Sequence, residues 1–342
     1  MSSLLIPAYK LTIGRKVVDT TDEPQASTAV DLTVALDLDT PADSFTLVLG
    51  NVGGLHPARD DEAIIELGYA DNGGLSQVMA GKVASVEPNV TTTRVIGYSG
   101  ADLLLRTFVD KTYESKKAGE IVRDLTSQAD VDVATAEDGI SFPAYVVDGR
   151  RSVYVHMRDI AELCGFELYL DNENKLVFQK FVNGKRIHKF EHGKHIIDLE
   201  VVRRPPHAGR VEAWGESPTG TKGDDAAAWL SRDFSGSRGQ AGSGALFLLE
   251  RSALRTRDAA RLAAQAALTD IQRRTLRGRV VTIGRPEIKL GDAIRLLEVP
   301  EESLNANYQV RSVTHRITKL GGFTTTVGFR AIATDGLPGS VI

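Results

Sequence analysis

The sequence has a single cysteine, Cys164, among its 342 residues. One thiol cannot form an internal disulfide framework, so nothing in the composition marks an oxidising compartment. No apolar run reaches the roughly 18 residues that a membrane-spanning helix needs, and the N-terminus lacks a signal-peptide pattern. These absences predict a protein that is made and folded in the cytoplasm and has no membrane-spanning segment.

An excess of positive charge is also missing. The chain has 41 Lys and Arg residues against 45 Asp and Glu residues, for a net charge of −4. Because phosphate binding relies on a basic face, the composition gives no reason to expect specific nucleic-acid binding. The hydrophobic fraction of 42% is ordinary for a soluble globular protein. A chain of this length is expected to hold two or three domains.

Only one group of residues has the composition of a metal site. His188, His192 and His195 lie close together in the chain. Neither an H-E-x-x-H helix nor a pair of closely spaced cysteines accompanies them, and Gly193 disfavours a helix that would gather them. We therefore interpret residues 187–195 as a basic turn between strands.

Other catalytic motifs are incomplete. Residues 215–222 are glycine-rich like a phosphate-binding loop, but Thr221 separates Gly220 from Lys222 and no strand-to-helix context surrounds them. The nucleophile motif G-x-S-x-G is absent, and Cys164 falls on the apolar face of its expected helix, which is typical of a packing residue. We predict a protein that is not an enzyme, with no catalytic, cofactor-binding or metal-binding residues and no cofactor.

Strand patterns dominate what is present, most clearly over residues 278–332. The odd positions from Phe323 to Ala331 are mostly apolar and alternate with Thr, Gly and Arg, which predicts a strand with one buried face. Residues 320–322 supply the loop of a hairpin. In the partner strand the apolar positions shift from even to odd. We therefore predict a β-bulge near Ser312, which adds the curvature that barrels require.

This C-terminal stretch is echoed near the N-terminus. Residues 61–67 resemble 291–297 in pattern, 77–86 occupy the place of 309–313, and 91–97 that of 324–330. Two interpretations are open: a true repeat, which would give two similar β-barrels, or a chance likeness between Thr-rich strands.

The rest of the chain divides by its periodicity. Residues 1–98 alternate as short strands and predict a first β-barrel. Residues 99–182 predict an α+β insert, with helices near 101–105, 115–129 and 152–164 and a hairpin at 166–178. A second β-barrel over 183–335 contains an exposed loop at 215–244 and an Ala-rich helix at 255–276, followed by a tail at 336–342. The narrow polar stripe of that helix predicts that it is mostly covered.

Several segments then resemble one family, the baseplate hub proteins of contractile injection machines. This family includes phage late control protein D, the T-even phage hub and the hub half of VgrG. The segments that carry the resemblance lie at 100–104, 108–113, 159–166, 176–178, 290–292 and 308–315. The match covers nearly the whole chain, although each motif reports a fold and not a site. The sequence ends soon after its last strand, which favours a spike carried on a separate polypeptide.

The resemblance implies a mainly β fold with two tube-type barrels in each chain of a trimer. Six barrels would then form a pseudo-sixfold ring that joins a hexameric tail tube to a three-fold spike. The implied partners are further copies of the chain, the tail tube and spike proteins, other baseplate components and, as a further candidate, the tape measure protein. Such a protein would be assembled in a virion or injection-machine baseplate. A hydrolase carried by a tail or secretion system and a secreted binding module remain as alternatives.

The alternation also suggests which residues would line the bore of such a ring. Polar strand positions such as Thr324, Thr326 and Arg330, or their echoes Thr92 and Arg94, are the candidates. We expect such positions to tolerate alanine.

Overall fold

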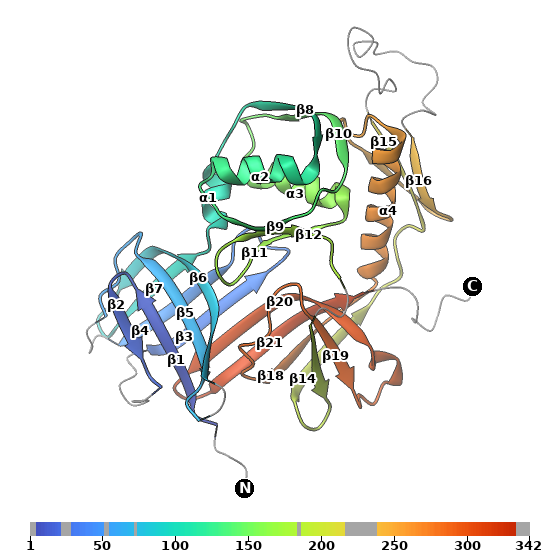
Figure 1. Ribbon diagram of the computed structural model, residues 1–342. Helices are drawn as coiled ribbons and strands as arrows, with labels where there is room; N and C mark the ends of the chain where they lie inside the picture. The colour runs from blue at the N-terminus through green and yellow to red at the C-terminus, as the bar shows by residue number, and fades with distance from the viewer. Residues whose placement is uncertain are drawn as a thin grey trace.

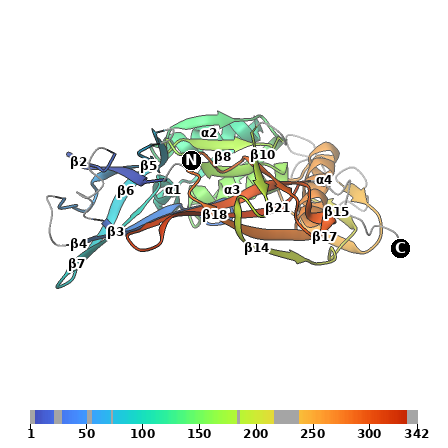
Figure 2. The ribbon, with the colours of Figure 1, turned by 90° about the horizontal axis from the view of Figure 1, so that it is seen from below.

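The computed structural model describes residues 5–21, 29–50, 55–71, 74–182, 186–215 and 238–332. It is a mainly β structure with large antiparallel sheets, in which a compact helical unit lies over the sheet strands and one longer helix stands beside it (Figure 1). Figure 2 shows the N-terminal strands at one end of the molecule and α4, with β15 and β17, at the other. Within the described residues, no helix is long and apolar enough to span a membrane.

The largest sheet has 13 strands and contains both β halves of the chain. The first half contributes seven strands in the order β3-β4-β7-β6-β5-β1-β2. Their bounds are β1 Pro7–Ile13, β2 Lys16–Asp19, β3 Ala29–Asp37, β4 Ser44–Gly50, β5 Glu62–Tyr69, β6 Gly74–Pro88 and β7 Thr92–Tyr98. Where the structure describes residues 1–98, their alternating patterns form strands, as predicted.

The second half contributes six strands in the order β14-β18-β21-β20-β19-β13. Their bounds are β13 Ile187–Glu191, β14 Ile196–Arg203, β18 Leu276–Ile283, β19 Ala293–Leu297, β20 Asn307–Thr318 and β21 Gly322–Ala331, with a short 3-10 helix at Glu302–Leu304. Antiparallel pairing of β20 with β3 joins the two halves. In the described chain the strand order is an open path from β14 to β2, and these pairings close no barrel.

The two halves repeat the same arrangement of strands. The first half runs β3-β4-β7-β6-β5-β1 and the second β14-β18-β21-β20-β19-β13, and corresponding strands also follow one another in the same order along the chain. The echo between residues 61–97 and 291–330 corresponds to β5–β7 and β19–β21. One difference is that β1 pairs antiparallel with β5, whereas β13 pairs parallel with β19.

Irregularities in strand pairing recur at equivalent places. β20 has a register shift between Val310 and Ser312, where the sequence predicted a bulge, and β6 has one between Val83 and Ser85. A second shift precedes Asp31 in β3 and Asp198 in β14. Shared bulges fix the alignment of the repeat, because each sets the face to which the following residues point.

This alignment corrects the last segment of the sequence comparison. Pairing 91–97 with 324–330 placed Val327 against Arg94. Counting from the bulges places Val327 against Val95, because Val86 pairs with Val95 and Val313 with Val327. The comparison was therefore one residue out of register in this strand, since repeated threonines give no unique alignment.

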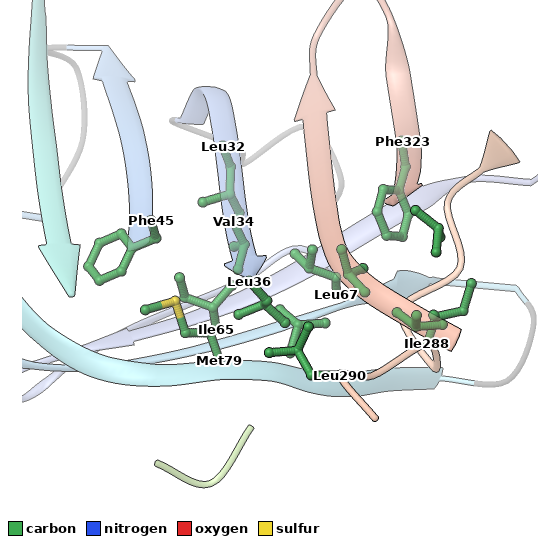
Figure 3. Close-up of a cluster of buried hydrophobic side chains, with 14 of the residues drawn as sticks. Leu32, Val34, Leu36, Phe45, Ile65, Leu67, Met79, Ile288, Leu290 and Phe323 are labelled. Carbon is green, nitrogen blue, oxygen red and sulfur yellow. The ribbon is translucent and has the colours of Figure 1, made fainter. Parts of the chain in front are cut away.

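The large sheet has one hydrophobic core to which both halves contribute. Figure 3 shows Leu32, Val34 and Phe45 of the first half in the same cluster as Ile288 and Phe323 of the second. The odd residues of β21 all point into this core, as predicted. Burial of one face of most of its strands is the main stabilising contribution expected for such a sheet.

Residues 99–182 form an α+β unit with a second hydrophobic core. Its elements are α1 Ala101–Arg106, β8 Lys111–Lys117, α2 Ala118–Gln128, β9 Val133–Ala136, β10 Ser141–Val147, α3 Val153–Cys164, β11 Glu167–Leu170 and β12 Leu176–Gln179. Gly165 ends α3 in the left-handed conformation, with φ of 68°, as its place after the helical pattern predicted. The helix expected from residue 115 begins only at Ala118, because residues up to Lys117 pair with β10.

The remaining elements, α4 and a three-stranded sheet, pack against this second core. They are β15 Arg210–Trp214, β16 Gly239–Gly242, β17 Leu246–Glu250 and α4 Arg257–Arg273. Residues 216–237 of the predicted loop lie outside the described residues, as does the tail at 336–342, but residues 239–242 form a strand and not a loop.

α4 is shorter than the 255–276 predicted. The Thr256 side chain caps its first turn by accepting a hydrogen bond from the Ala259 N–H at 3.2 Å, and Leu276 already belongs to β18. Four alanines, Ala259, Ala260, Ala263 and Ala264, form its buried face. Most residues of α4 are buried or partly buried, as the narrow polar stripe predicted, and Leu262, which retains 42% of its exposure, lies on the side that stays open among the described residues.

Candidate functional site

A groove of about 730 Å³ lies where the helical unit, α4 and the large sheet meet. The C-terminal end of α3, the following strand β11 and the polar face of α4 line its sides. Arg311 of β20 and Arg330 of β21 reach it from the sheet. The groove is therefore the place where all three parts of the described chain come together.

Beneath the groove lies a cluster of buried charges centred on Glu167, the first residue of β11. The Glu167 carboxylate accepts hydrogen bonds from Arg311 Nη1 at 2.6 Å and from Arg330 Nη2 at 2.9 Å. Gln309 Nε2 donates to the same carboxylate at 2.8 Å. The side chains of Glu167 and Arg311 retain only 11% and 10% of their exposure, so this pair is held away from water.

Two further carboxylates neutralise the arginines. Arg330 Nη1 donates to Asp270 of α4 at 2.8 Å, and Arg311 pairs with Asp39 in the turn between β3 and β4. The network thus links the first β half, the helical unit, the second β half and α4. A charge without its partner is costly in such surroundings, so the network holds these four parts in one relative position.

The ionisation state of Glu167 follows from this geometry. Burial acts to raise the pKa of its carboxyl group, but the opposing charges of Arg311 and Arg330 dominate and lower the pKa to about 2. Glu167 is therefore ionised throughout the neutral pH range.

Sequence reasoning missed this cluster. Arg330 was expected to face outward from β21, whereas its side chain is 11% exposed and bound to two carboxylates. The polar face of β21 is covered at this end by β11 and α4, and alternation along one strand does not reveal what covers its polar face. One feature of the sequence could have indicated the cluster. Arg311 is a charged residue at the predicted bulge, and bulges often redirect a side chain.

Three cations line the groove without a carboxylate partner among the described residues: Lys180, Arg251 and Arg273. Arg273 instead donates from Nε to the carbonyl of Ile332 at 2.9 Å, and its guanidinium lies 5.8 Å from the ring centre of Phe181. Burial lowers the pKa of Arg273. Asp159, Glu162 and Asp270 line the same groove, so its lining carries charges of both signs.

A second surface feature is the edge strand β17. Among the described residues it pairs with β15 alone, and Leu246 and Leu248 are 44% and 61% exposed. Exposed apolar side chains on an open edge are typical of a surface that contacts another chain.

The structure does not gather the three candidate metal ligands. His188 is buried on β13, where its Nε2 lies 2.8 Å from Asp292 Oδ2. His192 and His195 lie in the exposed turn after β13, and His195 Nδ1 accepts a hydrogen bond from the Glu191 N–H. No three His, Cys, Asp or Glu side chains converge as a metal site anywhere in the ranges that the structure describes. The residues 187–195 are thus a strand followed by a turn.

The remaining candidates are Cys164 and the glycine-rich stretch 215–222. Cys164 is partly buried at the end of α3 and accepts a long hydrogen bond from the Ile140 N–H at 3.4 Å. Burial raises the pKa of its thiol to about 12, so the reactive thiolate is scarce at neutral pH. Of the glycine-rich stretch 215–222, all but Gly215 lies outside the described residues.

Comparison with known proteins gives matches in structure alone. No family model matches the chain, and no curated protein matches its sequence. The 43 kDa tail protein of prophage MuSo2 from Shewanella oneidensis superposes with a TM-score of 0.72, covering 94% of this chain and 98% of its own at 11% identity. The chain has the fold of phage tail proteins.

Two further structures agree with this fold. A tail protein from Neisseria meningitidis MC58 has a TM-score of 0.70 at 11% identity, covering 97% of this chain and 98% of its own. A type VI secretion system component of E. coli, described as structurally similar to T4 bacteriophage tail proteins, has a TM-score of 0.58 at 10% identity. This match covers 95% of the present chain and 77% of the E. coli protein. The tail-protein fold thus accounts for nearly the whole chain.

Proposed function

We propose that this protein is the structural baseplate hub of a phage tail or of a phage-tail-like contractile injection machine. Three copies form a ring that joins the tail tube to the central spike. Residues 1–98 and 183–335 supply two tube-type barrel units per chain, and residues 99–182 are inserted between them. The completed ring therefore contains six similar β units.

The repeated strand order carries this proposal. A trimer matches a hexameric tube only if each chain offers two equivalent surfaces, and the two halves have the same six-strand order with bulges at equivalent positions. Each half remains an open sheet in the isolated chain, so neighbouring copies are the natural source of the strands that complete the barrels. The fold shared with phage tail proteins supports the same role.

The buried charge cluster fits a structural component. Glu167, Arg311 and Arg330 hold both halves and the helical unit in one relative position, and a symmetry adaptor needs this rigidity. The exposed apolar edge β17 and the groove, which is lined by charges of both signs, are available for the tube protein, the spike protein and other baseplate components.

The alternatives predict different behaviour. A hydrolase would need an activated nucleophile or a metal, and Cys164 has the opposite pKa shift to the one that activates a thiol. A secreted binding module would function as a stable monomer with a ligand in the groove.

The test is the native mass of the purified chain, alone and with its spike and tube proteins. A three-chain particle that binds a spike supports the hub. Metal-dependent turnover of cell-wall material would instead support the hydrolase, and a monomer that binds only a small ligand would support the binding module.

A further inference from the structure

The junction between the two halves of one chain provides a template for contacts between chains. β20 is paired on one edge with β19 as far as its bulge, and beyond the bulge, from Ser312 to Thr318, the same edge pairs with β3. β6 begins in the same way, because its first part pairs with β5 as far as Lys82. After its bulge, however, residues 85–88 pair with β7 alone within the described chain.

The strand that corresponds to β3 also lacks its second neighbour. β14 corresponds to β3, and it pairs with β18 but with no strand on its other side in the described sheet. Within one chain six strands separate β14 from β6 in the sheet order. The chain therefore contains one β3–β20 junction and the two unpaired halves of a second one.

Burial of the equivalent side chains supports this view. Leu32 and Val34 of β3 and Val313 of β20 are at most 1% exposed. Their equivalents Leu199, Val201 and Val86 pack against the same core but stay only partly buried. The difference is what a missing neighbouring strand would produce.

We propose that β14 of one copy pairs antiparallel with residues 85–88 of β6 in the next copy. This proposal rests on the trimeric hub proposed above and names the surface through which its copies meet. The template pairs Thr314 with Ala35. Counting from the shared bulges, the same register brings Glu87 opposite Val202 of the neighbouring chain.

Such a contact is heterologous, because it joins two different edges. Repeated by a three-fold rotation it closes into a ring and leaves no β14 or β6 edge open. Each ring would then contain three β3–β20 junctions within chains and three β14–β6 junctions between them. The six β units thereby become nearly equivalent, although only three chains are present.

Cysteine cross-linking tests the register directly. Directly opposed strand residues have Cα atoms about 4.5–5.5 Å apart, within the range that a disulfide spans. Glu87→Cys and Val202→Cys are combined in a Cys164→Ser background, and both new positions are exposed, so the fold should persist. After mild oxidation we expect most of the chain to migrate on a denaturing gel as covalent dimers and trimers, which a reductant converts back to monomers. Each single-cysteine variant should migrate as a monomer.

A second pair separates the alternatives. Val17→Cys with Val202→Cys in the same background would cross-link if the two ends of the sheet path, β2 and β14, met instead. A trimer by native mass that cross-links only through this second pair, or through neither, overturns the β14–β6 pairing and leaves the trimer standing. Cross-linking of a single-cysteine variant shows a two-fold contact and overturns both proposals, as does a chain that stays monomeric with its spike and tube proteins.

Discussion

The Glu167 carboxylate of β11 binds Arg311 of β20 and Arg330 of β21. These two arginines are in turn bound to Asp39 of the first β half and Asp270 of α4, so one carboxylate is the centre of the whole network. Removing its charge leaves two buried guanidinium groups with one carboxylate each. The size of the effect is set by desolvation, since the side chains of Glu167 and Arg311 retain only 11% and 10% of their exposure.

We therefore expect Glu167→Gln to lower the free energy of unfolding by about 3 kcal/mol, as measured by denaturant titration. The matched control is Glu173→Gln in the turn that follows β11, where the glutamate side chain is 61% exposed and paired with Lys175. That change should leave the free energy of unfolding nearly unchanged, because the pair is exposed to water. Equal losses of unfolding free energy for the two substitutions would show that the buried charge network does not stabilise the relative position of these parts.

His315 gives the molecule an acid-sensitive core. It is fully buried on β20, with Nδ1 at 3.0 Å from Thr325 Oγ1, and burial lowers its pKa from 6.5 to about 4. Protonation therefore favours the unfolded chain. The contribution of the neutral ring is complete above pH 6.5 and is lost as the pH falls through 4.

Measured as a pH series, the stability difference between the wild type and His315→Gln should change by up to about 3 kcal/mol between pH 6.5 and 4, in favour of the variant at acid pH. His192→Gln, at an exposed position in the turn after β13, serves as the control for replacing a histidine elsewhere in the chain. If the stability difference between the wild type and His315→Gln stayed constant over this pH range, burial would not shift the pKa of this ring as stated.

At the scale of elements, the sequence predicted best where one face of a strand is buried by its own neighbours. Local pattern and turn chemistry were enough to predict three features: the alternation of β21, the bulge before Ser312 and the ends of α3. Strands β8, β9 and β10 were missed. β8, for example, is exposed and lysine-rich, and its strand structure depends on pairing with β10, which local periodicity does not report.

β21 allows a test of its two faces with neighbouring residues. Val327 is fully buried between Val280 and Val313, so Val327→Asp should abolish folding, seen as loss of the cooperative unfolding transition and of soluble expression. Thr326→Ala on the opposite face should cost less than about 1 kcal/mol. A folded, soluble Val327→Asp protein would contradict the assignment of this face to the core.

α4 depends on small side chains where it packs against β16. A Cβ added to Gly239 of β16 would lie 2.1 Å from the carbonyl carbon of Ala260, so the strand touches the helix backbone. Ala260→Leu should therefore destabilise the protein by about 1–3 kcal/mol in thermal or denaturant unfolding. Leu262→Ala, on the exposed side of α4, should have little effect, and a comparable loss there would argue against this packing.

At the scale of the whole molecule, the repeat could be suspected from sequence, but its consequences could not. Asp31 and Arg316 form an ion pair across the β3–β20 junction at 2.6 Å, yet nothing near either residue in sequence indicates the other. The packing of α4 on the helical unit is equally non-local. Long-range strand and helix partners follow from which complete set of pairings buries the most surface, and one segment does not contain that information.

The strongest expectation at this scale concerns symmetry. We expect analytical ultracentrifugation of the chain in complex with its spike to give the mass of three copies of the chain plus that of the bound spike. Cryo-electron microscopy should then show a central channel surrounded by six similar β units. Polar strand positions such as Thr324 and Thr326 of one half and Thr92 and Arg94 of the other should face that channel at equivalent heights, since the shared bulges place Thr324 with Thr92 and Thr326 with Arg94. A two-fold dimer without a channel, or a ring whose halves differ in orientation, would contradict the hub, because a hexameric tube can seat only on six equivalent surfaces.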